Sequence, residues 1–448
     1  MAPPTRLVFS TVAALLVGVA LLVLGNGLQG TLIAVRADAE GFGEQVTGLI
    51  MAAYFAGFVV GSVTVPRLIE QAGHIRVFAA LASLASVATL AHVLKIDPWT
   101  WGGLRAINGW CYAGLVMVAE SWLNGSAAQA TRGRILSLYG IVMIGAWAVG
   151  QGLLTVADPE GFRLFLLVSI LISLSLVPIT LSRAQAPILP KALKLKLGRL
   201  YSVSPLGVVG CFASGLAMSA FWALGPVYAR GMGLGDSGVA LFMGVTMAGA
   251  LVLQWPVGAL SDRIDRRWVI TGASLAAAAA AVALAAVPPN GIGRLLALGF
   301  LFGGLGIPIY SLCVAHANDY LEPEELVTAT GGLLLLYGFG SMLGPVVAGA
   351  LMERGQGSGL FLWAGAVQAA TAIFAIWRMR RRAPPTVTER EAFRAVPRTT
   401  AAALELDPRG RPRPTGEPVS APPLGTISAE RGGRREPADD GPPRPGAA

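Results

Sequence analysis

Long apolar stretches alternate with short polar loops along most of the chain, from Leu7 to Trp377. Twelve of these stretches are long enough to cross about 30 Å of hydrocarbon as α-helices. A helix pairs its own backbone groups, which is what a segment surrounded by lipid requires. The pattern therefore predicts an all-α membrane protein with twelve transmembrane helices. The predicted segments are Leu7–Val35, Val46–Val65, Val77–Leu94, Trp99–Leu123, Ile135–Val156, Leu164–Leu181, Pro205–Ala229, Ser237–Leu260, Trp268–Val287, Leu295–Ala317, Leu326–Met352 and Gly359–Trp377.

The second half of this pattern repeats the first in the same orientation. The stretch ATRGRILSLYG at Ala130–Gly140 is similar to TATGGLLLLYG at Thr328–Gly338, and Val46–Leu49 is similar to Asp236–Val239 at nearly the same offset. Two six-helix halves, repeated in parallel about an axis along the membrane normal, are an architecture of secondary transporters. We therefore predict an N-terminal bundle (1–183), a cytoplasmic linker (184–203), a C-terminal bundle (204–382) and a tail (383–448). The tail is rich in Pro, Gly, Ala and Arg and has no long apolar run, so we expect it to be disordered.

The composition excludes a soluble globular protein. Hydrophobic residues make up 54% of the chain and charged residues 13%, with a mean hydropathy of +0.63. A soluble domain carries roughly twice that charged fraction. The net charge of +9 does not indicate nucleic-acid binding, because the basic residues fall in the loops and near the two ends. We expect a small-molecule substrate and the lipid bilayer as partners, no nucleic acid, and a monomer.

The sequence contains no recognisable catalytic or metal-binding constellation. The three cysteines lie in separate apolar runs and form neither a metal-ligand spacing nor an even disulfide set. The three histidines also lie in separate segments, and no H-E-x-x-H stretch is present. No Walker loop G-x-x-x-x-G-K-[ST] occurs, which argues against transport driven by ATP at this chain. We therefore expect no enzyme activity, no cofactor and no metal.

The charges of the loops predict the orientation in the membrane. If both ends lie inside, most of the basic loop residues lie on the cytoplasmic side, as the positive-inside rule requires. One acidic loop, Asp319–Glu325, falls on that side without a basic neighbour, but acidic residues weigh little in setting topology. We therefore predict a multi-pass protein of the bacterial inner membrane with both termini in the cytoplasm.

One polar loop between two apolar segments carries a distinctive charge pattern. This loop, Gly258–Arg267, reads GALSDRIDRR, and we call it the gate loop. Its side chains cannot lie in hydrocarbon, so it must turn at the membrane surface. The bland interpretation is a loop of topogenic arginines. The alternative is that the Asp262 carboxylate accepts hydrogen bonds from the N-terminus of a neighbouring helix, while the arginines of the loop bind acidic groups. The gate-loop candidates are Gly258, Asp262, Arg263, Arg266 and Arg267.

The spacing G-x-x-x-D-R-x-x-R-R resembles the loop signature of the major facilitator superfamily. In that family the loop latches the cytoplasmic side while the carrier faces outward, so the resemblance implies this role here. The match departs at Asp265, where the family prefers Gly. An echo at Gly61–Arg76 keeps Arg67 but has Val65 and Pro66 where the acid would stand. The stretches AESWLN, GHIRVFA and HANDYLEPEE are similar to the YcaD-like bacterial permease branch, whose substrate the resemblance does not supply.

A polar stripe runs along the predicted helix at Trp99–Leu123. Arg105, Asn108 and Tyr112 share one face, and Glu120 falls near it at the inner end. Such a stripe points to a bundle interior or a water-filled cavity. Arg105 could instead extend to the outer headgroups, and Glu120 could be an interfacial anchor. Arg105 also resembles the arginine of the family's fourth helix, which is linked there to proton coupling.

In the superfamily, the first, fourth, seventh and tenth helices line the central cavity. The substrate-cavity candidates that this implies are Asn26, Gln29, Arg105, Asn108, Tyr112, Trp222, Tyr228, Tyr310, His316 and Asn318. Each of them could equally be a structural hydrogen bonder between helices. GSMLGPVVAG at Gly340–Gly349 resembles the family's antiporter signature, but the first half has Gln151 where the proline would stand. This departure weakens any reading as a drug–proton antiporter.

The predicted function is secondary active transport of a small solute by alternating access, coupled to protons. The alternative is a membrane sensor or scaffold with the same fold, which would have no need for the polar stripe. The proton-coupling candidates are Glu120, Asp319 and Arg105. The two carboxyl groups could gain and lose a proton, whereas Arg105 stays charged and could exchange partners. We expect Arg105 to tune the field of the cavity or to bind an anionic group of the substrate, and Glu120 to be the proton site, with Asp319 second. Arg105 and Glu120 lie fifteen residues apart, about 22 Å along a helix, so they cannot pair directly.

Overall fold

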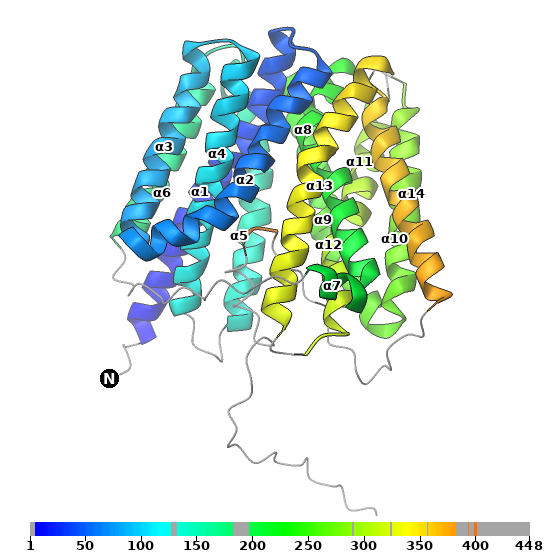
Figure 1. Cartoon of the computed structure of the whole chain (residues 1–448). Coiled ribbons are helices and arrows are strands. Elements are labelled where there is room, and N and C mark those ends of the chain that lie inside the picture. Colours follow the sequence, from blue (N-terminus) through cyan, green and yellow to red (C-terminus); the bar gives the residue numbers. More distant parts are fainter. Residues whose placement is uncertain are drawn as a thin grey trace, which may run out of the picture. The chain divides into compact units, whose positions relative to one another are not determined.

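Every regular element in the part of the chain that the structure describes is a helix (Figure 1). The structure is a computed structural model that describes residues 5–126, 132–181, 197–288, 291–322, 325–355, 357–381, 393 and 398–400. All of these belong to one compact unit, Met1–Arg411. The elements are α1 (Thr5–Ala39), α2 (Glu44–Ala72), α3 (His74–Leu94), α4 (Pro98–Ser126), α5 (Arg132–Gly152), the 3₁₀ turn η1 (Leu153–Val156), α6 (Arg163–Thr180), α7 (Leu197–Val203), α8 (Pro205–Gly231), α9 (Asp236–Arg263), α10 (Arg266–Ala285), α11 (Ile292–Gly306), α12 (Pro308–Asn318), α13 (Leu326–Arg354) and α14 (Gly359–Met379).

These helices confirm the prediction of an all-α membrane protein. Eleven spans in the described residues are long and apolar enough to cross a bilayer, with α11 and α12 counted as one. Apart from the seven-residue α7, the helix outside that set is α4, which has 29 residues and carries Arg105 and Asn108. These two polar residues lower its mean hydropathy. The predicted count of twelve is therefore met only if α4 is included.

Two predicted boundaries were wrong, and both involve proline. The second segment was expected to end at Val65, but α2 continues through Pro66 to Ala72. It ends at Gly73, whose φ of 83° is a conformation that glycine adopts without strain. The tenth segment was expected to be one helix, but it divides into α11 and α12 at Ile307. Pro308 has no N–H to donate to the preceding turn, so it occupies the first position of a new helix.

The two halves of the chain show the same helix pairings. In the first half α1 packs on α5 and α6, α2 packs on α4, and α3 packs on α4 and α6. In the second half α8 packs on α13 and α14, α9 packs on α11, and α10 packs on α11 and α14. The pairings match if α1 corresponds to α8, α2 to α9, α3 to α10, α4 to the span of α11 and α12, α5 to α13, and α6 to α14. The repeat seen in the sequence is thus expressed in the packing.

A close approach between backbones recurs at equivalent places of the two halves. A β-carbon on Gly57 of α2 would lie 1.9 Å from the carbonyl oxygen of Ala106 in α4. A β-carbon on Gly249 of α9 would lie 2.0 Å from the carbonyl oxygen of Phe300 in α11. Only glycine fits at such contacts, and small residues are what lets membrane helices pack closely.

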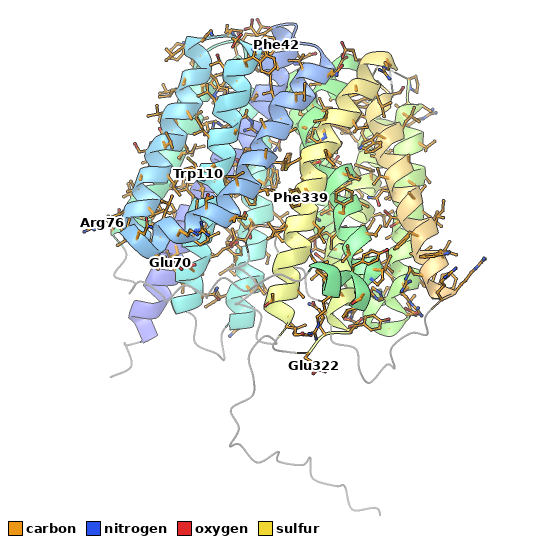
Figure 2. The ribbon with its side chains drawn as sticks, viewed as in Figure 1. Phe42, Glu70, Arg76, Trp110, Glu322 and Phe339 are labelled. Atoms are coloured by element: carbon orange, nitrogen blue, oxygen red, sulfur yellow. The ribbon has the colours of Figure 1, made fainter. Side chains whose placement is uncertain are left out.

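The halves contact each other mainly through α2 with α13, α5 with α9, and α1 with α8. We call the end of the bundle that carries Glu70 and Glu322 the gate-loop end, and the end that carries Phe42 the far end (Figure 2). The halves touch closely toward the far end. A β-carbon on Gly48 of α2 would lie 2.4 Å from the carbonyl oxygen of Pro345 in α13, and one on Gly349 would lie 3.0 Å from the Cα atom of Gln45.

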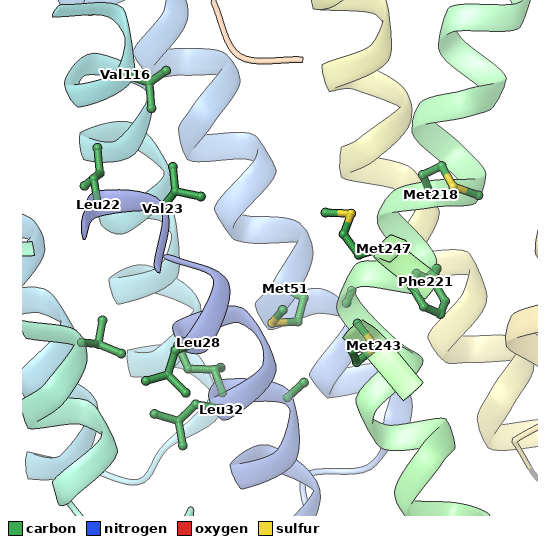
Figure 3. Packing of buried hydrophobic residues seen from close by; sticks show 14 of the residues in the cluster. Leu22, Val23, Leu28, Leu32, Met51, Val116, Met218, Phe221, Met243 and Met247 are labelled. Carbon is green, nitrogen blue, oxygen red and sulfur yellow. The ribbon is translucent and has the colours of Figure 1, made fainter. Parts of the chain in front are cut away.

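Buried apolar side chains from both halves form one large cluster (Figure 3). It includes Val23 and Leu28 of α1, Met51 of α2, and Met243 and Met247 of α9. A smaller cluster lies within the second half, between α8, α10, α12 and α13. The large cluster joins the two halves where they meet, so the space between them is bordered by apolar side chains.

Candidate functional site

A large cavity lies between the two halves. Its volume is about 1550 Å³, and its wall takes residues from α1, α2, α4 and α5 on one side and from α8, α9, α12 and α13 on the other. At the gate-loop end its wall includes Arg67 and Glu70 of α2, Arg134 of α5 and Asp262 of α9. Toward the far end the contacts of Gly48 and Gly349 bring the halves together. The cavity is therefore accessible from the gate-loop end and blind at the other.

Arg105 lies at the blind end of this cavity. Its side chain is 3% exposed, and its Cζ atom lies 4.3 Å from the centroid of the Tyr54 ring. Within the described residues its Nε and Nη1 atoms have no hydrogen-bond partner. Tyr54 is itself held in place, because its hydroxyl donates to Asn26 Oδ1 at 3.1 Å. The cavity thus holds a buried guanidinium that is packed on one face and has unpaired N–H groups.

Two other polar residues of the wall, Thr31 and Gln151, bond to each other. The Thr31 hydroxyl donates to Gln151 Oε1, and Gln151 Nε2 donates to the Gly27 carbonyl at 3.2 Å. Further along the cavity, Trp147 of α5 and Trp222 of α8 pack together with ring centroids 5.1 Å apart. The wall at this level is therefore mostly apolar and aromatic, with Arg105 as the exception.

The predicted polar stripe of α4 divides in the structure. Arg105 and Tyr112 line the cavity. Asn108 is 3% exposed and lies in a small separate void beside Gln29, and neither of its side-chain polar atoms has a partner in the described residues. Glu120 is fully buried and accepts a hydrogen bond from the Tyr139 hydroxyl at 2.5 Å. Its placement in the bundle interior argues against an anchor at the membrane surface.

The remaining cavity candidates separate into two groups. Asn26 and Trp222 line the cavity. The others are buried elsewhere in this conformation. Gln29, Tyr228 and Asn318 make the hydrogen bonds between helices that were the alternative for them. Tyr310 and His316 make ring contacts, and the Tyr310 hydroxyl has no hydrogen-bond partner in the described residues. The hydrogen bonds are Gln29 Nε2 to the Thr89 hydroxyl at 2.8 Å, the Tyr228 hydroxyl to the Leu284 carbonyl at 2.7 Å, and the Thr330 hydroxyl to Asn318 Oδ1 at 3.5 Å. The ring centroids of Tyr310 and Tyr337 lie 5.0 Å apart, and those of His316 and Tyr320 lie 5.2 Å apart. Their role in binding stays a prediction.

The gate loop forms two sets of ion pairs. Arg266, which is 2% exposed, pairs with Asp319 at 2.8 Å and with Asp262 at 3.2 Å. Arg267 pairs with Asp265 at 2.6 Å, and Asp265 also accepts a hydrogen bond from the N–H of Arg267. Asp265, the departure from the family pattern, therefore caps the N-terminus of α10. Arg263 is exposed.

Asp262 does not dock on a helix N-terminus in this conformation. Its Oδ1 atom accepts a hydrogen bond from the backbone N–H of Phe393 at 2.7 Å. The Phe393 ring lies against Gly258, where a β-carbon would come within 2.2 Å of it. The glycine of the gate loop thus leaves room for a residue of the tail.

Most of the tail lies outside the described residues, but four of its residues line the cavity. They are Phe393, Arg398, Thr399 and Thr400. The Arg398 guanidinium lies 5.5 Å from the Tyr310 ring centroid and donates to the Ile307 carbonyl. The hydroxyls of Thr399 and Thr400 donate to the Glu120 carboxylate. The sequence offered no signal for these contacts, because the tail has no motif and no apolar run.

Sequence reasoning also missed Tyr54, Trp147 and the Thr31–Gln151 pair. Tyr54 and Trp147 lie in segments that were interpreted only as apolar spans. The polarity of Tyr54 and Gln151 inside such spans was the available signal. What could not be read was which face of each helix is turned toward the cavity.

Comparisons with known proteins agree with this geometry. The model of the Major Facilitator Superfamily matches residues 15–251 and 207–429. An uncharacterized MFS-type transporter of Yersinia pestis is 28% identical over 357 residues, which cover 78% of this chain and 91% of that protein. The uncharacterized MFS-type transporter YcaD of Escherichia fergusonii is 27% identical over 367 residues, covering 80% and 92%.

Solved structures share the fold at low sequence identity. The nucleoside transporter NupG superposes with a TM-score of 0.70 at 14% identity, covering 83% of this chain and 100% of that one. An inward-facing, occupied bacterial homologue of the human lysosomal transporter Spinster gives 0.68 at 14% identity, covering 87% and 99%. The fucose:proton symporter FucP of E. coli gives 0.52 at 16% identity, covering 82% and 98%. Since the family model spans well over half of the sequence and the fold agrees, the chain belongs to the Major Facilitator Superfamily and is a multi-pass membrane transporter.

Proposed function

We propose that this protein is a secondary active transporter that carries a small solute across the bacterial inner membrane by alternating access. The observation that carries the proposal is the cavity between the two halves, which is accessible from one end and closed at the other. Rocking of one six-helix bundle against the other about a central site is how repeats of this kind alternate access. One chain supplies both halves, so the site is complete in a monomer.

The conformation corresponds to an inward-facing carrier if the gate-loop end lies in the cytoplasm. The basic loop residues support this orientation, because they gather at that end. In the outward-facing state the contacts of Gly48 and Gly349 would part, and the gate-loop end would close. Asp262 would then be released from Phe393 and become available to a helix N-terminus.

We assign proton coupling to Glu120, with Asp319 as the second choice. Both carboxyl groups are buried, but Asp319 is engaged by the guanidinium of Arg266 at 2.8 Å. The partners described for Glu120 are the hydroxyls of Tyr139, Thr399 and Thr400, which can adjust to either protonation state of a carboxyl group. FucP, which shares the fold, is a fucose:proton symporter by name.

Alternating access is tested by locking the far end. Gln45→Cys and Gly349→Cys place two thiols where the backbones of α2 and α13 approach closely, since a β-carbon on Gly349 would lie 3.0 Å from the Cα atom of Gln45. Gly30→Cys supplies a reporter, because its β-carbon would project into open space in the cavity wall. The three native cysteines are buried and are replaced by alanine. Labelling of Gly30→Cys by a membrane-impermeant maleimide is then measured in vesicles of both orientations.

Before oxidation we expect labelling from both sides, because the carrier exchanges between its two states. After oxidation we expect labelling only from the side of the gate loop. Reduction of the disulfide should restore labelling from the opposite side. Labelling confined to one side under all conditions would favour a scaffold or sensor with this fold. A Gly102→Cys and Gly103→Cys pair serves as an oxidation control, because both positions lie in one helix outside the cavity.

Proton coupling is tested with Glu120→Gln in proteoliposomes, once a transported solute is in hand. The amide keeps the size of the carboxyl group, and its NH2 group can donate to a hydroxyl that rotates to accept, but it cannot take up a proton. We expect solute exchange to continue while the response to a pH gradient is lost. Asp319→Asn is the matched variant. If Glu120→Gln still accumulated solute in response to a pH gradient, Glu120 would not be the coupling residue.

A further inference from the structure

Arg105 carries a charge that the described residues do not neutralise. It is 3% exposed, forms no ion pair in the described residues, and its Nε and Nη1 atoms have no hydrogen-bond partner there. The Tyr54 ring covers one face of the guanidinium and leaves its edge free. A buried charge without a partner is strongly unfavourable, so its retention in a cavity indicates a ligand that supplies the opposite charge.

The wall around this charge is apolar. Met51 of α2 and Met243 and Met247 of α9 border the cavity from opposite halves and belong to the same buried cluster (Figure 3). Trp147 and Trp222 add an aromatic surface. Methionine side chains are flexible and polarisable, and they adapt to apolar ligands of varied shape.

Several polar groups of the wall already make hydrogen bonds within the protein. Asn26 Oδ1 accepts from Tyr54, and Thr31 and Gln151 bond to each other. The hydroxyls of three lining serines donate to carbonyl groups of their own helices. These serines are Ser62, Ser137 and Ser341. A sugar or nucleoside would compete with these hydrogen bonds, whereas the edge of Arg105 is available as it stands and carries a charge.

We propose that the cavity binds an organic anion, with a carboxylate or phosphate head on an apolar body. The head pairs with the edge of Arg105 in the geometry that a guanidinium offers to such groups, and the body lies against the methionine and tryptophan wall. The proposal rests on the proposed transport function and names its substrate class. It concerns binding alone, so it can be tested without transport.

The test uses four small probes and the full-length protein in lipid nanodiscs. Naphthalene-2-carboxylate and 2-naphthyl phosphate carry the two candidate heads, 2-naphthamide is neutral, and acetate lacks the apolar body. Binding is measured by titration calorimetry, with empty nanodiscs as the blank. We expect a naphthyl anion to bind about tenfold or more tightly than naphthamide, as a charge-assisted pair predicts, and acetate to bind weakly. The tighter of the two anions identifies the head.

Variants at Arg105 attribute this preference to its charge. Arg105→Gln should bring the anion to the affinity of the amide, and Arg105→Lys should retain part of the preference. Arg230→Gln is the matched control, because Arg230 pairs with Asp236 outside the cavity wall. Equal affinity for anion and amide in the natural protein would overturn the proposal even if Arg105→Gln did not fold. So would an anion preference that survives Arg105→Gln. If the far-end cross-link did not change the labelling of Gly30→Cys, the transport proposal would be overturned. The measured preference for the anion would still stand.

The tail residues in the cavity support a second inference, which rests on separate contacts. Phe393 donates its N–H to Asp262, and Thr399 and Thr400 donate their hydroxyls to Glu120. The two threonine side chains are 6% and 1% exposed. The tail therefore contacts both Asp262 of the gate loop and Glu120, the residue to which we assign proton coupling.

We infer that the cavity is a binding site for Phe393 and Arg398–Thr400 of its own chain. While these residues are in place they occupy the space through which a solute enters from the gate-loop end. A ligand that enters from this end must displace them, so its apparent affinity falls by the fraction of time that they are bound.

The Gly30→Cys reporter measures this occupancy from the gate-loop side. Thr399→Val together with Thr400→Val removes the two hydroxyls with little change in size. We expect this pair, and equally a chain without residues 383–448, to be labelled several-fold faster by an impermeant maleimide. Thr415→Val, further along the tail, is the control and should leave the rate unchanged. Equal labelling of the natural, double-valine and shortened chains would show that the tail does not occupy the cavity.

Discussion

Arg105 and Arg266 are both almost completely buried, at 3% and 2% exposure, but their surroundings are opposite. Arg266 lies between two carboxylates, Asp319 at 2.8 Å and Asp262 at 3.2 Å. Arg105 has a tyrosine ring on one face and unpaired N–H groups at its edge. Burial alone therefore does not tell what a charged residue does.

The difference lies in where each counter-charge comes from. The counter-charges of Arg266 are side chains of the same chain, Asp262 and Asp319. Their ion pairs connect α10 to the end of α9 and to the residue after α12. The counter-charge of Arg105 is not among the described residues, so this arginine is ready to receive one. A paired buried charge stabilises its own arrangement, whereas an unpaired one lowers stability in exchange for binding.

The largest expected effect is at Arg266. Arg266→Gln leaves Asp319 buried without its guanidinium, and breaking a buried pair from one side costs about 3–5 kcal/mol of unfolding free energy. Thermal unfolding of the purified protein should show a large fall in melting temperature. Adding Asp319→Asn to Arg266→Gln should recover part of the loss, because the second change removes the orphaned charge. A loss no larger than that of Glu322→Gln, an exposed acid, would contradict a structural role for the pair.

The same substitution at Arg105 should have the opposite sign. Arg105→Gln removes a buried charge that has no partner in the described residues, so we expect a gain of about 1 kcal/mol or more in unfolding free energy. The measurement is the melting temperature without ligand, beside Arg230→Gln as control. A fall as large as that of Arg266→Gln would show that Arg105 also has a structural counter-charge, and the contrast between the two arginines would fail.

The smallest effect is expected at Asp265, which departs from the family pattern and caps α10. Asp265→Ala removes the cap and the pair with Arg267, and should cost about 1 kcal/mol. Asp265→Gly should cost only a few tenths of a kcal/mol in the capping contribution, because glycine is tolerated at a cap. Melting temperatures of the two variants give the comparison. If both changes were as harmful as Arg266→Gln, the loop would depend on Asp265 as much as on the buried pair.

Much of this protein follows from local sequence patterns. The membrane class, the placement of nearly all spans, the parallel repeat and the family could be predicted, because the length of an apolar run and the charges of a loop depend on neighbours in the chain. The gate loop and the unusual position of Arg105 were visible for the same reason. The two errors in the helix boundaries also arose at single residues. The helix α2 continues past Pro66, whereas a new helix begins at Pro308.

The cavity was decided by tertiary packing. Arg266 and Asp319 lie 53 positions apart, and Glu120 meets Thr399 at a separation of 279 positions. Tyr54 stacks on Arg105 only because α2 packs on α4 through glycine contacts. Along any apolar helix each face could be turned to lipid, to another helix or to a cavity, and the sequence of one helix does not choose among them. The close approach of the helices makes that choice, and with it decides which polar groups are paired and which remain ready to bind a ligand.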